Sequence, residues 1–220
     1  MRHIKSQKGV KMREIKSQKG VSSINMKRKI YQQLSDWKEK RKGEVALLIE
    51  GARRIGKSYI VEEFAKNEYE SYILIDFNKA PQMVRDWFDL YVEDLDTLFL
   101  YLSQHYKVKL HERKSLIIFD EIQLCPRARA AIKYLVADGR YDYIETGVLV
   151  SIKKNTQGIV IPSEELPIQM YPMDFEEFLW ATDNYMLMEL IRKMYMERKP
   201  MGQAFHRKAM EAFRLYMIVG

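Results

Sequence analysis

The sequence predicts an α/β fold in which helices cover a parallel β-sheet. Short apolar runs, of the kind that form strands buried on both faces, alternate with segments of helical periodicity. The first run leads into a glycine-containing loop, and the third run ends in two carboxylates. Because ligands bind at the carboxyl ends of the strands in open α/β sheets, we expect the loop and the carboxylates to meet at one edge.

The composition indicates a globular protein with one sizeable domain and room for a second, partial one. Hydrophobic residues make up 47% of the 220 residues and charged residues 30%, as in ordinary globular domains. The single cysteine excludes an internal disulfide and is typical of a reducing compartment. No apolar run reaches the length of a membrane span, and the basic N-terminus lacks the apolar region of a secretory signal. We therefore expect a cytoplasmic protein without a membrane partner.

The net charge of +7 is concentrated at the N-terminus, where residues 1–30 hold ten Lys/Arg and one acid. Residues 4–10 recur as residues 15–21, an internal repeat of two copies. The polar, basic composition predicts a disordered tail over residues 1–25. Nucleic acid could bind through residues 1–30, although base-stacking aromatics are absent there.

The folded part is expected to begin with an amphipathic helix over residues 26–42. Ile30, Leu34 and Trp37 share one apolar face of this helix. The continuous apolar run at residues 45–49 then predicts the first strand, buried on both faces.

Residues 51–58 read GARRIGKS and match the phosphate-binding loop pattern GxxxxGK[ST]. The glycines let backbone N–H groups surround phosphate oxygens. Lys57 would reach the β- and γ-phosphates, and the Ser58 hydroxyl would ligate Mg²⁺. The helix expected from residue 59 would direct its positive N-terminus at the same anion; an ordinary strand-to-helix turn is the alternative. The predicted nucleotide-binding residues are Gly51, Ala52, Arg53, Arg54, Ile55, Gly56, Lys57, Ser58 and Tyr59.

A second buried strand is predicted over residues 71–76, and residues 81–106 are expected to be helical. The next apolar run, at residues 116–119, ends in Asp120 and Glu121. This pattern is the second chemical signature of phosphate-loop NTPases. Asp120 would hold Mg²⁺, and Glu121 would orient and deprotonate the attacking water. A buried strand that merely ends in two solvated acids is the alternative.

The remaining elements follow from shorter patterns. Cys125-Pro126 predicts the start of a helix with Arg127, Arg129 and Lys133 facing outward. Residues 141–147 predict a strand in which the Thr146 hydroxyl could contact the γ-phosphate or the attacking water.

Two further elements are predicted near the end of this region. Residues 166–170 offer a fifth strand. Asp174 is expected to cap a helix that runs through Trp180.

Four stretches together resemble the prokaryotic AAA-type ATPases that usually carry a C-terminal domain of unknown function. They are residues 51–58, 116–123, 145–147 and 171–179. The resemblance covers roughly residues 27–220 and implies a P-loop NTPase fold, a three-layer α/β/α sandwich with a five-stranded parallel sheet. The Thr146 strand would lie between the loop strand and the Asp120 strand.

The resemblance also implies ATP and Mg²⁺ as ligands, with Lys57, Glu121 and Thr146 as catalytic residues and Ser58 and Asp120 at the metal. Relatives continue well past residue 220. We therefore expect three parts: the tail over residues 1–25, an ATPase domain over residues 26–181, and the helical start of an incomplete C-terminal region over residues 182–220. The expected partners are a second copy of the chain or the missing C-terminal region.

Two departures from the family pattern bear on catalysis. Val148 replaces the serine that usually follows Thr-Gly, which leaves Thr146 and Ser151 as candidates near the γ-phosphate. Gly158-Ile159 stands where Gly-Arg is usual, so the pattern identifies no arginine finger. The unsupported candidates for that role are Arg127, Arg129 and Arg140.

The predicted function is ATP hydrolysis that drives a conformational change. A nucleotide-binding switch with negligible hydrolysis is the alternative, favoured by the two departures. A nucleic-acid-binding module built on the basic tail is the third possibility.

Overall fold

The computed structural model describes residues 27–148 and 163–219. In this part of the chain, five strands form one sheet in the order β2-β3-β4-β1-β5, and every neighbouring pair is parallel. This confirms the predicted five-stranded parallel sheet and the place of the Thr146 strand, β4, between β1 and β3. The strands are β1 (Ala46–Glu50), β2 (Ser71–Asp76), β3 (Ser115–Asp120), β4 (Asp142–Gly147) and β5 (Glu165–Gln169).

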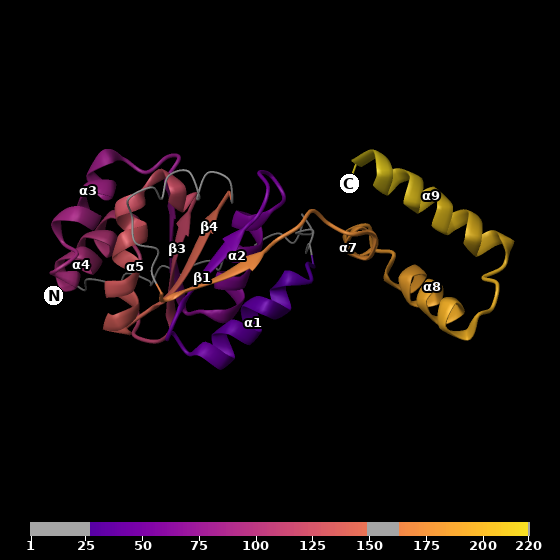
Figure 1. Cartoon of the computed structure of the whole chain (residues 1–220), viewed down its shortest axis with the longest axis horizontal. Coiled ribbons are helices and arrows are strands. Elements are labelled where there is room, and N and C mark those ends of the chain that lie inside the picture. The colour runs from indigo at the N-terminus through magenta and orange to yellow at the C-terminus, as the bar shows by residue number, and fades with distance from the viewer. Residues whose placement is uncertain (1–26, 149–162, 220) are drawn as a thin grey trace, which may run out of the picture.

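Helices cover both faces of the sheet, which confirms the three-layer arrangement (Figure 1). One face carries α1 (Ile30–Arg41) and α2 (Lys57–Glu68). The other face carries α3 (Gln82–Leu90), α4 (Leu95–Tyr106) and α5 (Pro126–Asp138). A short 3₁₀ helix, η1 (Ile122–Leu124), connects β3 to α5.

The continuous apolar run of β1 is explained by the helices that cover both faces of the sheet. Leu47 and Ile49 pack into the core beneath α1 and α2. Ala46 and Leu48 pack into the opposite core beneath α3, α4 and α5. Because side chains alternate between the two faces of a strand, only a strand covered on both faces needs an unbroken apolar sequence.

The helical region expected over residues 81–106 is two helices rather than one. Residues 91–94 separate α3 from α4, and the Asp94 carboxylate accepts a hydrogen bond from the Thr97 backbone N–H at 3.2 Å. Apolar periodicity continues through this break, so only the capping residue marks it. The first helix also begins later than expected, at Ile30 instead of residue 26.

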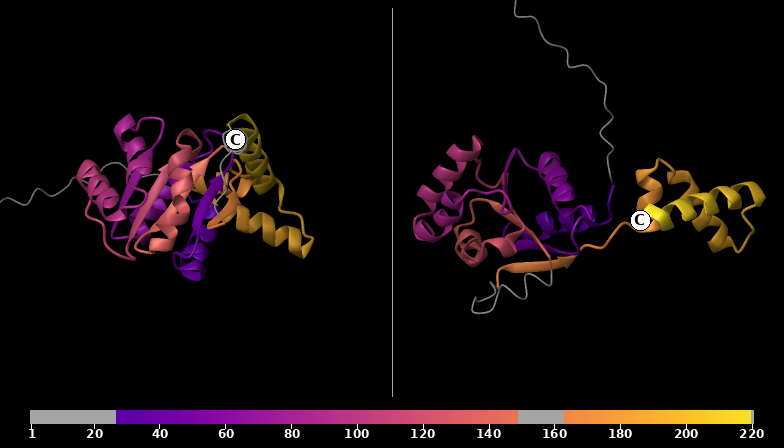
Figure 2. Two further views of the ribbon diagram at one scale, coloured as in Figure 1. Left: turned by 60° about the vertical axis from the view of Figure 1, so that its left-hand side comes forward. Right: turned by 90° about the horizontal axis from the view of Figure 1, so that it is seen from above.

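Three helices at the end of the chain lie to one side of the sheet (Figures 1 and 2). They are α7 (Phe175–Ala181), α8 (Tyr185–Glu197) and α9 (Gln203–Val219). They share a small core that includes Phe178, Leu179, Leu187 and Ala209. Asp174 caps α7 as predicted, in a capping box with Glu177. No described helix is long and apolar enough to cross a membrane.

Candidate functional site

The glycine loop connects the carboxyl end of β1 to the first turn of α2, as the sequence predicts. Gly51 has no room for a side chain, since a Cβ there would lie 2.4 Å from the Met170 carbonyl oxygen. Gly56 has a φ of 93°, a backbone conformation that favours glycine. Arg54 also has a positive φ, 64°. The loop therefore turns tightly over the end of the sheet and leaves the side chains of residues 52–54 exposed.

Lys57 is folded onto the inner side of the loop. Its ammonium donates hydrogen bonds to the carbonyl oxygens of Gly51, at 3.2 Å, and Ala52, at 2.7 Å. The side chain is 5% exposed. Burial lowers the pKa of Lys57, an effect that the Glu121 and Asp120 carboxylates oppose. A buried cation so close to the loop is a suitable partner for a phosphate group.

Ser58 and Asp120 bring the two predicted motifs together. The Ser58 hydroxyl lies 2.8 Å from Asp120 Oδ1 and 2.9 Å from Oδ2. The buried Thr146 hydroxyl, from the adjacent strand β4, also donates to Asp120 Oδ1. A hydroxyl and a carboxylate side by side are oxygen donors that fit Mg²⁺, which protein sites usually bind through one or two carboxylates together with substrate phosphates.

Glu121 directly follows β3 in a left-handed conformation, with a φ of 57°. This region is uncommon for residues other than glycine and clusters at functional sites. The Glu121 backbone N–H lies 3.3 Å from the Thr146 hydroxyl, and its carboxylate accepts a hydrogen bond from the Gln123 side chain. The carboxylate is therefore held at the same edge of the sheet as Ser58.

The structure thus brings Lys57, Ser58, Asp120, Glu121 and Thr146 to one edge of the sheet. Their assignment to catalysis or to the metal remains a prediction. Thr146 is fully buried, and its hydroxyl faces Asp120. Ser151 and the segment 158–159 lie outside the described residues, as does the tail over residues 1–25.

The prediction that Arg129 faces outward is wrong. Arg129 is 4% exposed, and its guanidinium forms a two-pronged pair with the Glu165 carboxylate, at 2.9 and 2.7 Å. Helical periodicity predicts that the charge faces solvent, but Glu165, the first residue of β5, supplies a buried carboxylate as its partner. Arg129 is therefore part of the packing of α5 on the sheet.

The other two candidate arginines also have partners away from the loop. Arg127 pairs with Asp89 at 2.5 Å. Arg140 precedes β4, at the opposite end of the sheet from the loop, and pairs with Asp138 and Asp96. Neither donates a hydrogen bond to a loop residue in the described part of the chain.

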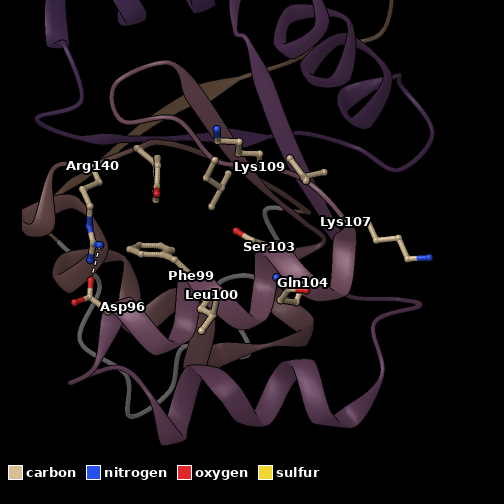
Figure 3. A pocket seen from close by; sticks show the side chains of 11 residues that line it. Asp96, Phe99, Leu100, Ser103, Gln104, Lys107, Lys109 and Arg140 are labelled. Atoms are coloured by element: carbon tan, nitrogen blue, oxygen red, sulfur yellow. Dashed lines mark hydrogen bonds and ion pairs between the residues drawn. The ribbon is translucent and has the colours of Figure 1, made fainter.

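Two of the cavities in the described part of the chain differ in their position relative to the loop. One, of about 570 Å³, lies between α1, α2, α7 and α8, and its lining includes Arg28, Ile60 and Trp180. Ile60 lies two residues after Ser58, so this cavity adjoins the phosphate loop. The other, of about 560 Å³, is lined by residues of α4, by residues 107–110 and by Arg140 and Tyr141 just before β4 (Figure 3). There Arg140 points to Asp96, and Lys107 points away from the cavity (Figure 3).

Arg28 is the residue of this site that sequence reasoning missed. Its guanidinium donates to the Ile55 carbonyl oxygen within the loop, at 2.8 Å. It lies in the basic stretch of residues 1–30 and in the helix expected over residues 26–42, and neither pattern assigns it a role. No local pattern connects it to the loop, because its partners lie 27 or more residues away along the chain.

No curated protein matches the sequence. One solved structure that matches is that of C. elegans PCH-2, with 12% sequence identity and a TM-score of 0.34; the match covers 76% of this chain and 43% of that chain. The chain thus spans less than half of that protein.

A family model described as an AAA domain matches residues 44–179. The match begins just before β1 and ends within α7. It includes all five strands and both chemical motifs. Because it covers more than half of the sequence, the chain belongs to this family of AAA domains.

Proposed function

We propose that the chain binds ATP together with Mg²⁺ at the phosphate loop and hydrolyses the γ-phosphate. Membership of the AAA domain family indicates a nucleotide-binding ATPase in general terms. The observation that carries the more specific proposal is the contact between Ser58 and Asp120, which joins the loop to the acidic end of β3. An ordinary strand-to-helix turn would not require these two residue types to meet.

Each residue of the site has a distinct role in this proposal. The loop N–H groups and the Lys57 ammonium bind the phosphate oxygens. Ser58 and Asp120 hold Mg²⁺, which supplies positive charge against the charge that develops on the phosphates. Glu121 accepts a proton from the attacking water, and the Gln123 amide fixes the direction of that carboxylate.

The cavity beside α2 is suited to the nucleoside part of ATP. Its lining combines apolar and aromatic surface, from Ile60, Tyr31 and Trp180, with polar groups that include Gln32 and Asn67. Cavities of a few hundred Å³ lined in this way are typical small-molecule sites. Its place next to the phosphate loop allows one ligand to occupy both.

Conformational coupling is the second part of the proposal. The helices α7, α8 and α9 follow directly on β5 and form their own small core. A group of helices that is tied to the loop at few points could move as a unit when the phosphates change.

A switch that hydrolyses ATP negligibly is the second candidate. The observation that favours it is that Arg127, Arg129 and Arg140 are all paired with carboxylates away from the loop. Arginine fingers can supply about 10³–10⁵ in rate, so a site without one would turn over slowly.

One experiment separates the candidates. ATP is titrated calorimetrically into the full chain with and without Mg²⁺, and steady-state phosphate release is then measured. Binding that strengthens with Mg²⁺ supports the proposed site, and phosphate release distinguishes the ATPase from the switch. Absence of ATP binding by a folded chain would refute both.

A further inference from the structure

Three segments that are distant in sequence meet at the side chain of Arg28. One terminal nitrogen, Nη1, donates to the Ile55 carbonyl oxygen at 2.8 Å, and the other, Nη2, donates to the Tyr171 carbonyl oxygen at 2.7 Å. The Nε atom lies 3.2 Å from a Glu177 carboxylate oxygen. The side chains of Arg28 and Glu177 are 6% and 7% exposed. A single buried guanidinium thus contacts the phosphate loop, the connection after β5, and α7.

Glu177 is itself held in place on several sides. Its Oε1 accepts a hydrogen bond from the Lys29 backbone N–H at 2.7 Å, and its Oε2 accepts one from the Asp174 N–H at 3.1 Å. Its own N–H donates to the Asp174 carboxylate at 2.9 Å. The position of the carboxylate is therefore fixed to the first turn of α7, and Arg28 is fixed to α7 through it.

The hydrogen bond from Arg28 to the Ile55 carbonyl fixes the direction of the Gly56 backbone N–H. The peptide bond between Ile55 and Gly56 is planar and trans, so its N–H points opposite to its carbonyl. Arg28 holds that carbonyl, and the Gly56 N–H therefore points away from Arg28. In a phosphate loop, backbone N–H groups of this kind are the anion donors. Rotation of the peptide would need the Arg28 hydrogen bond to break.

We propose that Arg28 is a positioning residue that orients the Ile55–Gly56 peptide for phosphate binding and links the loop to α7. Nucleotide binding and the packing of α7 are then coupled through the Arg28–Glu177 pair. Coupling of this kind is reciprocal, so changes at Glu177 must alter nucleotide affinity by the same route. This inference rests on the proposed function, because it requires a nucleotide at the loop.

A second ion pair on α7 provides a matched control. The Arg192 guanidinium contacts both oxygens of Glu176 at 2.9 Å, but the Arg192 side chain is 59% exposed. Glu176 lies on the same helix as Glu177, whereas Arg192 lies on α8, and within the described residues this pair makes no hydrogen bond or ion pair to the loop. The Glu176 side chain is 11% exposed, and it keeps a second partner, Lys29 at 2.8 Å, when Arg192 is replaced. We therefore expect Arg192→Gln to leave nucleotide binding unchanged.

The test uses four variants of the full chain: Arg28→Gln, Arg28→Lys, Glu177→Gln and the control Arg192→Gln. The dissociation constant for a slowly hydrolysed ATP analogue with Mg²⁺ is measured by calorimetry. Amide hydrogen exchange of residues 175–181 is measured with and without saturating analogue. Circular dichroism and melting temperature confirm that each variant is folded.

We expect Arg28→Gln to weaken binding at least about tenfold, the effect of one lost charge-assisted hydrogen bond. Arg28→Lys should not restore affinity, since an ammonium lacks the planar fork that reaches both carbonyls. The analogue should slow exchange in α7 of the wild-type chain and of Arg192→Gln. That protection should be lost in Arg28→Gln and Glu177→Gln even when the loop is saturated.

The inference is overturned, with the proposed function intact, if the wild-type chain binds the analogue and Arg28→Gln matches Arg192→Gln in affinity and in α7 exchange. If the wild-type chain does not bind nucleotide, the proposed function fails and the inference fails with it. If Arg28→Gln does not fold, Glu177→Gln decides by the same two readouts. Its amide oxygen can still accept from the Lys29 N–H while the charge is removed.

Discussion

Lys57 offers the most direct test of the phosphate loop at the scale of a single residue. We expect Lys57→Ala to weaken ATP binding by about 10- to 100-fold, the value of a lost charge-assisted contact of about 1.5–3 kcal/mol. Calorimetric titration measures the effect. Lys66→Ala is a suitable control, because Lys66 lies on the same helix and pairs with Glu62 at the surface. Equal affinity in wild type and Lys57→Ala would rule out the proposed phosphate site.

Glu121 separates binding from hydrolysis. Glu121→Gln keeps the shape of the side chain but removes the base, so ATP should remain bound while turnover falls by about 10²–10⁴-fold. Asp120→Asn should instead weaken the dependence of binding on Mg²⁺. Phosphate release and calorimetry with varied Mg²⁺ measure the two effects, and Glu70→Gln, which changes an exposed pair with Lys114, is the control. Wild-type turnover in Glu121→Gln would mean that another group is the base.

At the scale of whole elements, β4 and β5 carry a buried acidic pair. Glu145 is fully buried. Burial, and then the nearby Glu165 carboxylate, raise the pKa of Glu145 well above its usual value of 4.5, and Arg129 opposes this. The folded chain therefore holds a proton that the unfolded chain releases.

The sign of the pH dependence follows from that proton. Its contribution to stability is fully present below about pH 4.5 and is lost as the pH rises toward the raised pKa, by up to about 1.4 kcal/mol per pH unit. Glu145→Gln mimics the protonated form and should remove this loss. We expect the difference in unfolding free energy between Glu145→Gln and wild type to grow from pH 4.5 upward in urea titrations. Parallel pH curves for the two proteins would contradict the expected shift.

Most of the sheet was predictable because each strand is marked by a short apolar run in the sequence. The unbroken apolar run of β1 requires cover on both faces, and α1 and α3–α5 supply it. The motifs then place the site at the carboxyl edge. Arg28 and Arg129 were not predictable in this way, because their partners Glu177 and Glu165 come from distant elements. From the sequence alone, a charged side chain is expected to face solvent. The buried carboxylate that pairs with it becomes apparent only in the folded structure.

At the scale of the whole molecule, α8 and α9 present an extensive apolar surface. Several large side chains are more than two-thirds exposed in the described structure: Met186, Tyr195, Met196, Met217 and Ile218. Large exposed apolar surfaces often mark a site of protein–protein contact. We therefore expect the chain to self-associate through residues 182–220.

A second expectation concerns the rate of ATP hydrolysis. We expect the chain to turn over ATP well below the ~1–100 s⁻¹ of efficient phosphoryl-transfer enzymes. Light scattering at several concentrations gives the oligomeric state, and phosphate release gives the rate. Met186→Glu with Ile218→Glu should shift the chain toward monomer, while Met83→Glu, at an exposed position of α3, should not. A monomer that turns over faster than about 1 s⁻¹ would contradict both expectations.

The two glycines that define the loop are constrained by different physics, which affects how mutagenesis of this loop is interpreted. A side chain at Gly51 would collide with the Met170 carbonyl oxygen, so Gly51→Ala would force the connection after β5 away from β1. If Gly51→Ala lowered the ATPase activity, the cause would be disturbed packing of the sheet. A Cβ at Gly56 would make only ordinary contacts, the nearest with Arg28 Nη1 at 3.5 Å, but φ there is 93°, so Asn, which tolerates positive φ, should be accepted there better than Ala. An alanine scan would score the two positions alike, although only the replacement at Gly51 would disturb the sheet.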